Sequence, residues 1–339
     1  MPEWIIAVDA MGGDNAPRAV CEGALQALRE MPEIGVRLYG RENEIRACLG
    51  EYGDVKDRLE IVHAEEVIDM HESPMMAVRK KTDSSLVKAM LAVKNGEAQA
   101  FVSAGSTGAL LAGGMTRVGR IRGIERPALA TVFPGRRGLF MLIDCGANVD
   151  CQPKYLTQFG LMGKVYMENV LGMHDPAVGL VNIGAEDTKG NALSKETYQL
   201  MKAQSVYRFA GNVEARDIPL GEVQVVVCDG FDGNLILKYT EGLSSAMVGM
   251  LKEEMLSSLR TKLGAALVMP ALKRFKGRLS AENVGGAPLL GVNGAIIKAH
   301  GNSNATAFKN AIRQARDMLK GRVTEEIQSG LQRLLPEEG

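Results

Sequence analysis

The chain has 339 residues, of which 46% are hydrophobic, and its 40 basic side chains balance 40 acidic ones. This length allows one large or two ordinary domains with a substantial core, while the charge balance argues against binding nucleic acid over the whole surface. The five cysteines are odd in number and include no C-x-x-C pair, which indicates a reducing compartment and argues against a zinc site. We therefore expect no metal and no nucleic-acid partner, although a local basic patch is left open.

The N-terminus and the apolar runs indicate a cytoplasmic protein. The chain enters an apolar run at Trp4, with no basic segment or apolar signal core before it, so we expect no signal peptide. No apolar run approaches the roughly 20 residues that a helix needs to cross a bilayer. Any association with a membrane is therefore expected to be peripheral.

The first element is the stretch WIIAVDAMGGDNAP, in which Trp4 to Val8 predict a short buried strand. A glycine pair after a strand often brings backbone N–H groups close to a phosphate. Here, however, the loop has no lysine, and the carboxylates of Asp9 and Asp14 would repel a phosphate. The loop also matches neither G-x-G-x-x-G nor G-x-x-x-x-G-K-[ST], so its role is not that of a known nucleotide loop.

Apolar runs, glycine-rich polar loops and helical stretches then alternate along the chain. The sequence predicts helices over Pro17 to Glu30 and Glu42 to Leu49, and a longer helix from Glu72 to a stop at Gly96. The apolar runs are rich in valine and isoleucine without alternation, so we expect strands that are buried on both faces. This pattern predicts an α/β fold with a mostly parallel sheet, as one two-lobed unit over residues 1–339 rather than two independent domains.

Six loops that follow the predicted strands are polar and rich in glycine. In open α/β sheets, ligands bind outside the carboxyl ends of the strands, so these loops could converge on one cleft. The alternative is that Gly, Asn and Asp are ordinary turn formers, which explains one loop more readily than all six. The six loops are DAMGGDN, SAGSTG, DCGAN, NIGAEDTKGN, DGFDGN and HGNSN.

Three of these loops carry side chains suited to an anion or an oxyanion. In SAGSTG, Ser106 and Thr107 can cap a following helix while free N–H groups face a phosphate. Lys189 can bind phosphate or an oxyanion as a point charge, and Asn234 can donate to a developing oxyanion. The alternatives are a plain helix cap at Ser106 or Asn234 and a solvated lysine at Lys189.

His300 and Cys145 are weaker candidates. His300 could act as a general base, but a structural role is equally consistent with a chain that has four histidines. Cys145 follows Asp144 at a predicted strand end, where it could be a nucleophile. Without a histidine beside it in the sequence, we expect Cys145 to be a small buried apolar residue instead.

The stretch from Met247 to Ser280 combines an apolar stripe with basic residues. Apolar side chains recur every four residues from Met247 to Leu267, and six basic residues but no acidic one occur from Arg260 to Arg278. Each Lys or Arg near an anionic membrane surface contributes about 1 kcal/mol to binding. We therefore expect an amphipathic helical segment at 247–280 that lies on a membrane. The alternative is a core or dimer helix with a solvated basic face.

Seven long motifs follow one another from Ile5 to about residue 320 without an evident gap. They are IAVDAMGGDNAP, ESPMMAVRKKTDSS, AFVSAGSTGALLA, IDCGAN, NIGAEDTKGN, CDGFDGN and IIKAHGNSNATAFKNAIRQA. Together they resemble the motifs of the bacterial phosphate acyltransferases of phospholipid synthesis, the PlsX family. Motifs of this length are far more specific than a glycine triplet.

The resemblance implies transfer of a fatty acyl group from acyl carrier protein to inorganic phosphate, which gives acyl phosphate and the free carrier thiol. It implies a three-layer α/β/α sandwich, similar to phosphotransacetylases and to the isocitrate dehydrogenase-like group, in a homodimer without a cofactor. The product would feed a membrane glycerol-3-phosphate acyltransferase on the way to phosphatidic acid. Peripheral contact with the membrane, and with that enzyme, is part of this expectation.

The resemblance also places two catalytic residues, Lys189 and Asn234, on this sequence. Phosphate is a nucleophile and a thioester is already activated, so the site has to align them and stabilise the oxyanion, without a covalent enzyme intermediate. We expect Lys189 to hold the phosphate or the oxyanion, and Asn234 to donate to the oxyanion or to orient the acyl carbonyl. The residues expected to bind phosphate or substrate are Ser106, Thr107, Gly108 and His300, and those expected to shape the cleft are Asp9, Gly12, Gly13 and Asp14.

Two other readings of the sequence stay open. An NAD-dependent dehydrogenase on the related fold would need a dinucleotide loop and a cluster of metal-binding carboxylates, and neither signature is recognisable. A non-catalytic membrane scaffold for lipid synthesis would explain the basic amphipathic stretch, but it would leave the six polar loops without a purpose.

Overall fold

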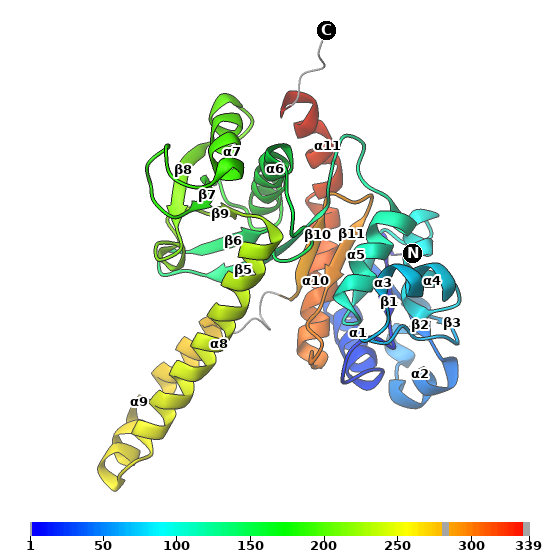
Figure 1. The fold of residues 1–339 in the computed structure, drawn as a ribbon. Coiled ribbons are helices and arrows are strands. Elements are labelled where there is room, and N and C mark those ends of the chain that lie inside the picture. Colours follow the sequence, from blue (N-terminus) through cyan, green and yellow to red (C-terminus); the bar gives the residue numbers. More distant parts are fainter. Residues whose placement is uncertain (1, 280–284, 335–339) are drawn as a thin grey trace.

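The computed structural model describes residues 2–279 and 285–334. Within these residues, eleven strands form one sheet in the order β3-β2-β1-β4-β11-β10-β5-β6-β9-β7-β8, and helices cover both of its faces (Figure 1). Most neighbouring strands are parallel. The predicted α/β fold with a mostly parallel sheet is therefore confirmed.

The first lobe is built from the N-terminal strands and closed by strands from near the C-terminus. Its strands are β1 (Trp4–Asp9), β2 (Ile34–Gly40), β3 (Leu59–His63), β4 (Ala100–Ser103), β10 (Ala287–Leu290) and β11 (Ala295–Lys298). Its helices are α1 (Arg18–Glu30), α2 (Glu42–Leu49), α3 (Pro74–Lys80), α4 (Ser85–Lys94), α5 (Thr107–Gly113) and α10 (Ala305–Lys320), with short turns η1 (Gly53–Arg58) and η2 (Gly114–Val118). Because β11 pairs with β4, the lobe joins two distant parts of the chain.

The single helix predicted from Glu72 to Gly96 is wrong, because the chain forms α3 and α4 with a turn between them. Ser84 adopts an extended backbone, and its hydroxyl accepts a hydrogen bond from the Val87 amide (3.4 Å), which caps α4. A serine that bonds the backbone in this way favours a helix start over a helix interior.

The second lobe carries the middle of the chain. Its strands are β5 (Ala128–Pro134), β6 (Leu139–Ile143), β7 (Val178–Asn182), β8 (Phe209–Glu214) and β9 (Val225–Val227). Its helices are α6 (Pro153–Asn169) and α7 (Ala192–Ala203), with the short turn η3 (Ile218–Leu220), and α11 (Val323–Leu334) packs on α6. The two lobes share one core: on α10, Gln314 donates to the hydroxyl of the fully buried Tyr166 on α6 (2.7 Å).

Strand direction reverses between the lobes. β10 is antiparallel to both β11 and β5, and β5 is antiparallel to β6, whereas the strands on either side of this region are parallel. In Figure 1, β5 and β6 lie crosswise to β10 and β11. The six polar loops consequently form two groups, one at the carboxyl ends of each lobe's parallel strands.

Helices α8 (Gly230–Met255) and α9 (Leu259–Leu279) form a hairpin that projects from the body (Figure 1). We call residues 239–279 the arm. The segment predicted at 247–280 is helical, but the chain reverses between Met255 and Leu259, so its apolar positions fall on two helices. Residue 280 and the side chains of Lys273, Lys276 and Arg278 lie outside the described residues. In the part of the chain that the structure describes, no helix has the length and apolar character required to span a bilayer.

Candidate active site

The first group of loops is tied together by Asp9, the last residue of β1. Its carboxylate is almost fully buried and accepts hydrogen bonds from the hydroxyls of Ser85 on α4 (2.6 Å) and Ser103 at the end of β4 (2.7 Å). Burial raises the pKa of the Asp9 carboxyl above its ordinary value, although four hydrogen bonds oppose the rise. Asp9 therefore fixes two neighbouring strand ends and the start of a helix.

The glycine pair after Asp9 lets the loop pass very close to its neighbours. A Cβ atom on Gly12 would lie 2.7 Å from the Gly105 nitrogen, and one on Gly13 would lie 2.8 Å from the Cβ of Ala104. Gly13 also has a φ of +102°, which favours glycine. The Asp14 amide donates to the Gly301 carbonyl (2.8 Å), so the loops after β1, β4 and β11 form one compact group.

Lys298, the last residue of β11, lies inside this group and was not among the predicted site residues. It is only 8% exposed, and its Nζ donates to the carbonyls of Ala104 (3.4 Å) and Ala299 (2.5 Å). Burial lowers the pKa of Lys298 to about 8, against the opposing effect of the negative charges of Asp9 and Asp14. In the sequence, Lys298 closes an apolar run directly before a glycine loop, as in AIIKAHGNSN, a position where a lysine is usually solvated, so no local signal marks its burial.

The loop between β4 and α5 holds three of the predicted residues. Ser106 caps α5, because its hydroxyl accepts a hydrogen bond from the Ala109 amide (3.4 Å), and it is 6% exposed. Thr107 and Gly108 form the first turn of α5. A Cβ atom on Gly108 would lie 2.6 Å from Pro74, so α3 packs directly on this turn. The cap that the sequence offered as an alternative for Ser106 is thus present.

The second group of loops is organised by Asp144, which follows β6. Its buried carboxylate accepts hydrogen bonds from the Leu129 and Ala147 amides and from the backbone and side-chain nitrogens of Asn148 (2.7–3.1 Å). Burial raises the pKa of this carboxyl as well. The Asn148 carbonyl in turn accepts from the Gly230 amide (2.7 Å), so this loop holds the first turn of α8 in place.

Asn234 lies within α8 and is exposed to solvent. The helix-capping alternative for this residue is wrong, because α8 begins at Gly230 and Asp229 caps it by accepting from the Asp232 amide (2.8 Å). Lys238 lies one turn beyond Asn234, on the same face of the helix. Its charge also lowers the pKa of Lys298, so this face of α8 is within electrostatic reach of the first group of loops.

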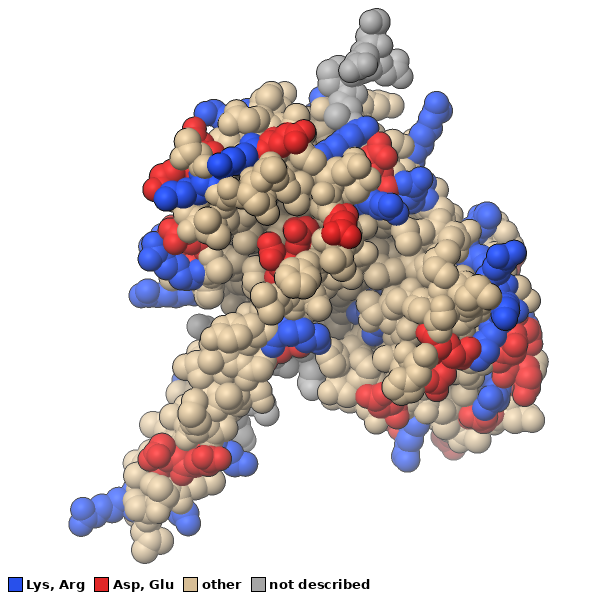
Figure 2. All heavy atoms as spheres, viewed as in Figure 1, with Lys and Arg blue, Asp and Glu red and all other residues tan. Residues whose placement is uncertain are grey.

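Figure 2 shows a hollow between the α8–α9 hairpin and the first lobe, which we call the interlobe region. Lys298 and its loops belong to one side of this region, and the base of α8 with Asn234 and Lys238 belongs to the other. Each side presents a cation, and each is braced by a buried carboxylate, Asp9 or Asp144. Such a place suits an anion that has to be held against a second reactant.

Lys189 projects from the loop after β7, next to β9 in the sheet. Its side chain is 49% exposed, and its Nζ lies 3.9 Å from a carboxylate oxygen of Glu186. Asn182 donates to the Lys189 carbonyl (3.2 Å), and Asn212 donates to the Glu186 carbonyl (2.8 Å), which anchors the loop. Lys189 and Asn234 therefore follow adjacent strands, although no described hydrogen bond or ion pair joins them.

The remaining candidates differ in exposure. His300 is exposed on the loop after β11, where its carbonyl accepts from the Ser303 amide (3.1 Å). Cys145 is buried, donates its thiol to the Leu142 carbonyl (3.2 Å), and has a pKa that burial raises to about 12. A thiol in this state is not a nucleophile. Over residues 2–279 and 285–334, the His, Cys, Asp and Glu side chains form no group that could hold a metal ion.

The chain is similar to known proteins over nearly its whole length. A family model described as fatty acid synthesis protein matches residues 4–326. A phosphate acyltransferase of Clostridium botulinum (strain Loch Maree / Type A3) is 51% identical over 331 residues, which is 98% of each chain. One of Clostridium perfringens (strain SM101 / Type A) is 51% identical over 326 residues, 95% of this chain and 96% of the other.

Solved structures of phosphotransacetylases share the fold. One from Streptococcus pyogenes aligns with a TM-score of 0.61 and 16% identity, over 93% of this chain and 94% of that chain. The EutD phosphotransacetylase from Staphylococcus aureus aligns with a TM-score of 0.58 and 14% identity, over 95% and 94%. At such low identity the likeness concerns the arrangement of helices and strands, which agrees with the expected phosphotransacetylase-like fold.

Proposed function

The chain belongs to the fatty acid synthesis protein family and is an enzyme that transfers acyl groups to phosphate, and we propose that its donor is a fatty acyl thioester of acyl carrier protein. The products are then acyl phosphate and the free carrier thiol. An oxygen of hydrogen phosphate forms the new bond to the thioester carbon, the carbon–sulfur bond breaks, and the phosphate proton ends on the sulfur. No cofactor and no covalent enzyme intermediate take part.

The strongest support for this chemistry at the interlobe region is Lys298. Lys298 is only 8% exposed, and Lys238 on α8 is within electrostatic reach of it. The two cations therefore provide a positive field in a place of low dielectric. In our proposal Lys298 attracts the phosphate dianion, and the loops of Ser106 to Gly108 and of His300 bound the same site. The closely packed residues around Asp9 keep these loops in position.

Asn234 and Lys189 act on the acyl group from the second lobe. Asn234 donates from the base of α8 to the oxyanion that forms on the thioester carbonyl, where a preorganised donor is most effective. Lys189 neutralises the phosphate or the oxyanion from the neighbouring strand end. Its loop is anchored through Asn182 and Asn212, which limits the freedom of an otherwise exposed side chain.

The arm supports a second part of the proposal, namely homodimer formation and peripheral contact with a membrane. Its exposed side chains include Met247, Leu251, Leu259, Leu263 and Leu267, the last three of which are more than 70% exposed. An apolar surface of this extent marks an interface rather than a solvated helix. Arg260, Lys262 and Arg274 add positive charge that favours an anionic bilayer.

This placement also fits the proposed use of the product. Acyl phosphate is apolar along its chain and labile at its anhydride bond, so release near a bilayer limits its hydrolysis. We propose that a membrane glycerol-3-phosphate acyltransferase consumes it on the way to phosphatidic acid. Direct contact with that enzyme is the partner interaction that this route suggests.

The test is to incubate the purified protein with palmitoyl acyl carrier protein and phosphate, and to detect acyl phosphate by trapping with hydroxylamine. We expect acyl phosphate from the wild type and little from Lys189→Ala at unchanged stability. Near wild-type turnover by Lys189→Ala would show that Lys189 does not take part in catalysis. Reduction of a nicotinamide by the protein would favour the dehydrogenase, and vesicle binding without any turnover would favour the scaffold.

A further inference from the structure

Helix α3 presents a surface in which exposed methionines stand beside basic residues. Met75 is 55% exposed and Met76 is 45% exposed, whereas the next two residues of the helix are buried against the first lobe. The segment before the helix adds Met70, which is 55% exposed. We call this surface the α3 face, and it consists of Met70, Met75, Met76, Arg79, Lys80 and Arg117.

The α3 face lies beside the proposed active site. Pro74, at the start of α3, packs on Gly108 in the first turn of α5, next to Ser106. At the other end of the helix, Arg117 donates to the carbonyl of Val78 (2.8 Å), so the η2 turn holds the C-terminal end of α3. In Figure 1, α3 and α5 lie on the side of the first lobe that faces the centre of the molecule.

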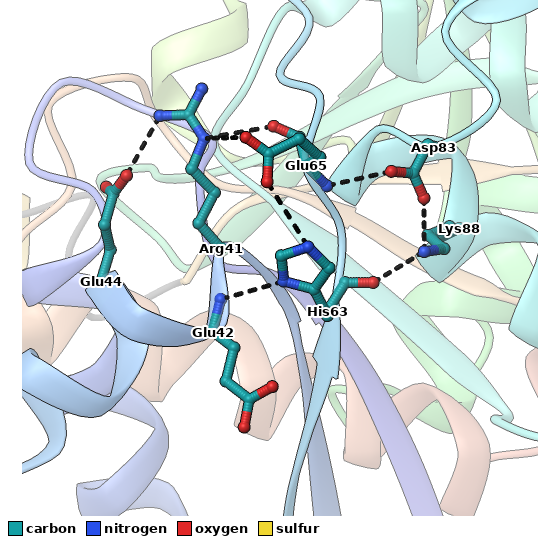
Figure 3. Close-up of polar contacts among 7 residues, drawn as sticks. All are labelled: Arg41, Glu42, Glu44, His63, Glu65, Asp83 and Lys88. Carbon is teal, nitrogen blue, oxygen red and sulfur yellow. Dashed lines mark hydrogen bonds and ion pairs between the residues drawn. The ribbon is translucent and has the colours of Figure 1, made fainter.

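Among the described residues, the cations of the α3 face have no carboxylate partner, unlike the cations of the network in Figure 3. In the network of Figure 3, Arg41 pairs with Glu44 (3.1 Å) and Lys88 pairs with Asp83 (2.5 Å). Among the described residues, by contrast, no carboxylate oxygen lies within 4.0 Å of a side-chain nitrogen of the three basic residues of the α3 face.

The acidic residues nearest in sequence are already engaged. Glu72 pairs with Lys81 (2.5 Å), and a carboxylate oxygen of Asp69 accepts from the His71 amide (2.9 Å). Glu72 and Lys81 neutralise each other, whereas Asp69 keeps its negative charge, which does not offset the three cations of the α3 face. The α3 face therefore has a net positive charge together with flexible apolar side chains. Methionines of this kind adapt to partners of varied shape, and unpaired charge steers a partner of opposite sign.

We propose that the α3 face is the docking surface for an acidic face of the acyl carrier protein, an inference that rests on the proposed function. A carrier protein that delivers its acyl thioester to the interlobe region has to dock on the protein surface next to that region. The α3 face is adjacent to Ser106 and Gly108, and its charge complements a carrier rich in carboxylates. The arm is a poorer candidate for this partner, because its exposed surface is dominated by apolar side chains suited to a bilayer or a second copy.

The test compares two charge-reversed variants. Arg79→Glu/Lys80→Glu changes the α3 face, and Lys56→Glu/Lys94→Glu makes the same change of charge at exposed lysines of the same lobe. The control lysines lie just before the amino ends of β3 and β4, away from the polar loops. Neither pair belongs to the proposed catalytic machinery. Turnover is measured with palmitoyl acyl carrier protein and with a carrier-free palmitoyl pantetheine thioester.

For the α3 variant we expect the KM for the carrier substrate to rise about tenfold or more at low salt, with kcat and the carrier-free reaction nearly unchanged. The control should resemble the wild type, and added salt should raise the wild-type KM towards that of the variant. An unchanged carrier KM, an equal loss on both substrates, or an equal effect of the control would overturn the docking surface. Weaker binding of the α3 variant to anionic vesicles, with the carrier KM unchanged, would assign the face to a membrane.

The proposed docking surface and the proposed function can be disproved separately. If the wild type does not transfer from the carrier to phosphate at all, the proposed donor is wrong. Binding of the carrier protein, measured by fluorescence anisotropy at low salt, then decides the docking surface by itself. Equal affinity of the wild type and the α3 variant in that measurement would contradict it.

Discussion

The loops around Asp9 bury polar groups, whereas the arm exposes apolar side chains, and both arrangements depart from the usual one in a folded protein. Around Asp9, carboxylate, hydroxyl and ammonium groups are buried and hydrogen-bonded. Along the arm, large apolar side chains such as Leu259 and Leu267 are more than 80% exposed. Both arrangements cost stability unless something compensates, and buried polar groups and exposed apolar patches are therefore the informative exceptions in a fold.

This difference indicates what each region contributes to the function of the protein. The buried loops are fixed by many mutual contacts, so they can hold reactants in a set geometry. The arm has little to fix it within one chain, so its stable environment has to come from another molecule. Changes in the loops should thus affect chemistry or folding, and changes in the arm should affect association, which the following experiments can separate.

The largest effect is expected at the base of α8. Asn234→Ala should lower kcat about 10²–10³-fold, because it removes a preorganised donor to the oxyanion, while KM changes little. Steady-state kinetics with palmitoyl acyl carrier protein measure this. A variant whose sole defect is a raised KM would make Asn234 a binding residue.

The next largest effect is expected inside the loop cluster. Asp9→Ala leaves the hydroxyls of Ser85 and Ser103 without their buried acceptor, so the free energy of unfolding should fall by about 3 kcal/mol. Asp9→Asn keeps one oxygen acceptor and should lose clearly less. Urea denaturation of both variants measures the difference, and equal stability of Asp9→Ala and wild type would show that Asp9 does not hold the cluster together.

A moderate effect is expected at the arm. Leu263→Glu should weaken binding to anionic vesicles about tenfold, because it removes apolar burial and adds charge repulsion. Turnover of palmitoyl acyl carrier protein in solution should largely survive, because Leu263 lies on the projecting arm, outside the polar loops, and is 72% exposed. Complete loss of activity, or conversion to a monomer with unchanged vesicle binding, would assign this position to the dimer interface.

The smallest effect is a dependence on pH. Below pH 8 the Lys298 ammonium is charged and attracts phosphate, and above its pKa of about 8 the amine is neutral. The value of kcat/KM for phosphate should therefore fall as pH rises through 8, by several-fold over the first unit. Lys298→Met should have a lower value without this decline, and an identical decline in that variant would exclude Lys298 as its cause.

The sequence predicts the elements better than their pairing. β4 and β9 are short apolar runs that precede two of the six polar loops, SAGSTG and DGFDGN, and they were expected on that basis, as was α2 with its bounds. β5, β8 and β10 precede none of the six loops and were not predicted. The reversal of direction between the lobes depends on the antiparallel pairings of β5 and β10. Such pairings are decided by contacts between distant parts of the chain, which local patterns do not encode.

The candidate site was predictable in its loops but not in its buried cation. Glycine, serine and acidic residues at strand ends point to the loops around Ser103 and Asp144. Lys298 is invisible in the same pattern, because a lysine at the end of an apolar run is usually solvated. Its burial depends on the loops that begin at Asp9 and Ala104, which are far from Lys298 in the sequence.

Direct attack of phosphate on the carrier thioester is the central claim, and one rapid-quench measurement tests it. The enzyme, in excess over palmitoyl acyl carrier protein, is mixed without and then with phosphate, and free carrier thiol and acyl phosphate are quantified over one turnover. We expect no thiol without phosphate, and thiol and acyl phosphate appearing together in equal amounts once it is added. Release of thiol before phosphate is present, with the acyl group left on the protein, would contradict the account.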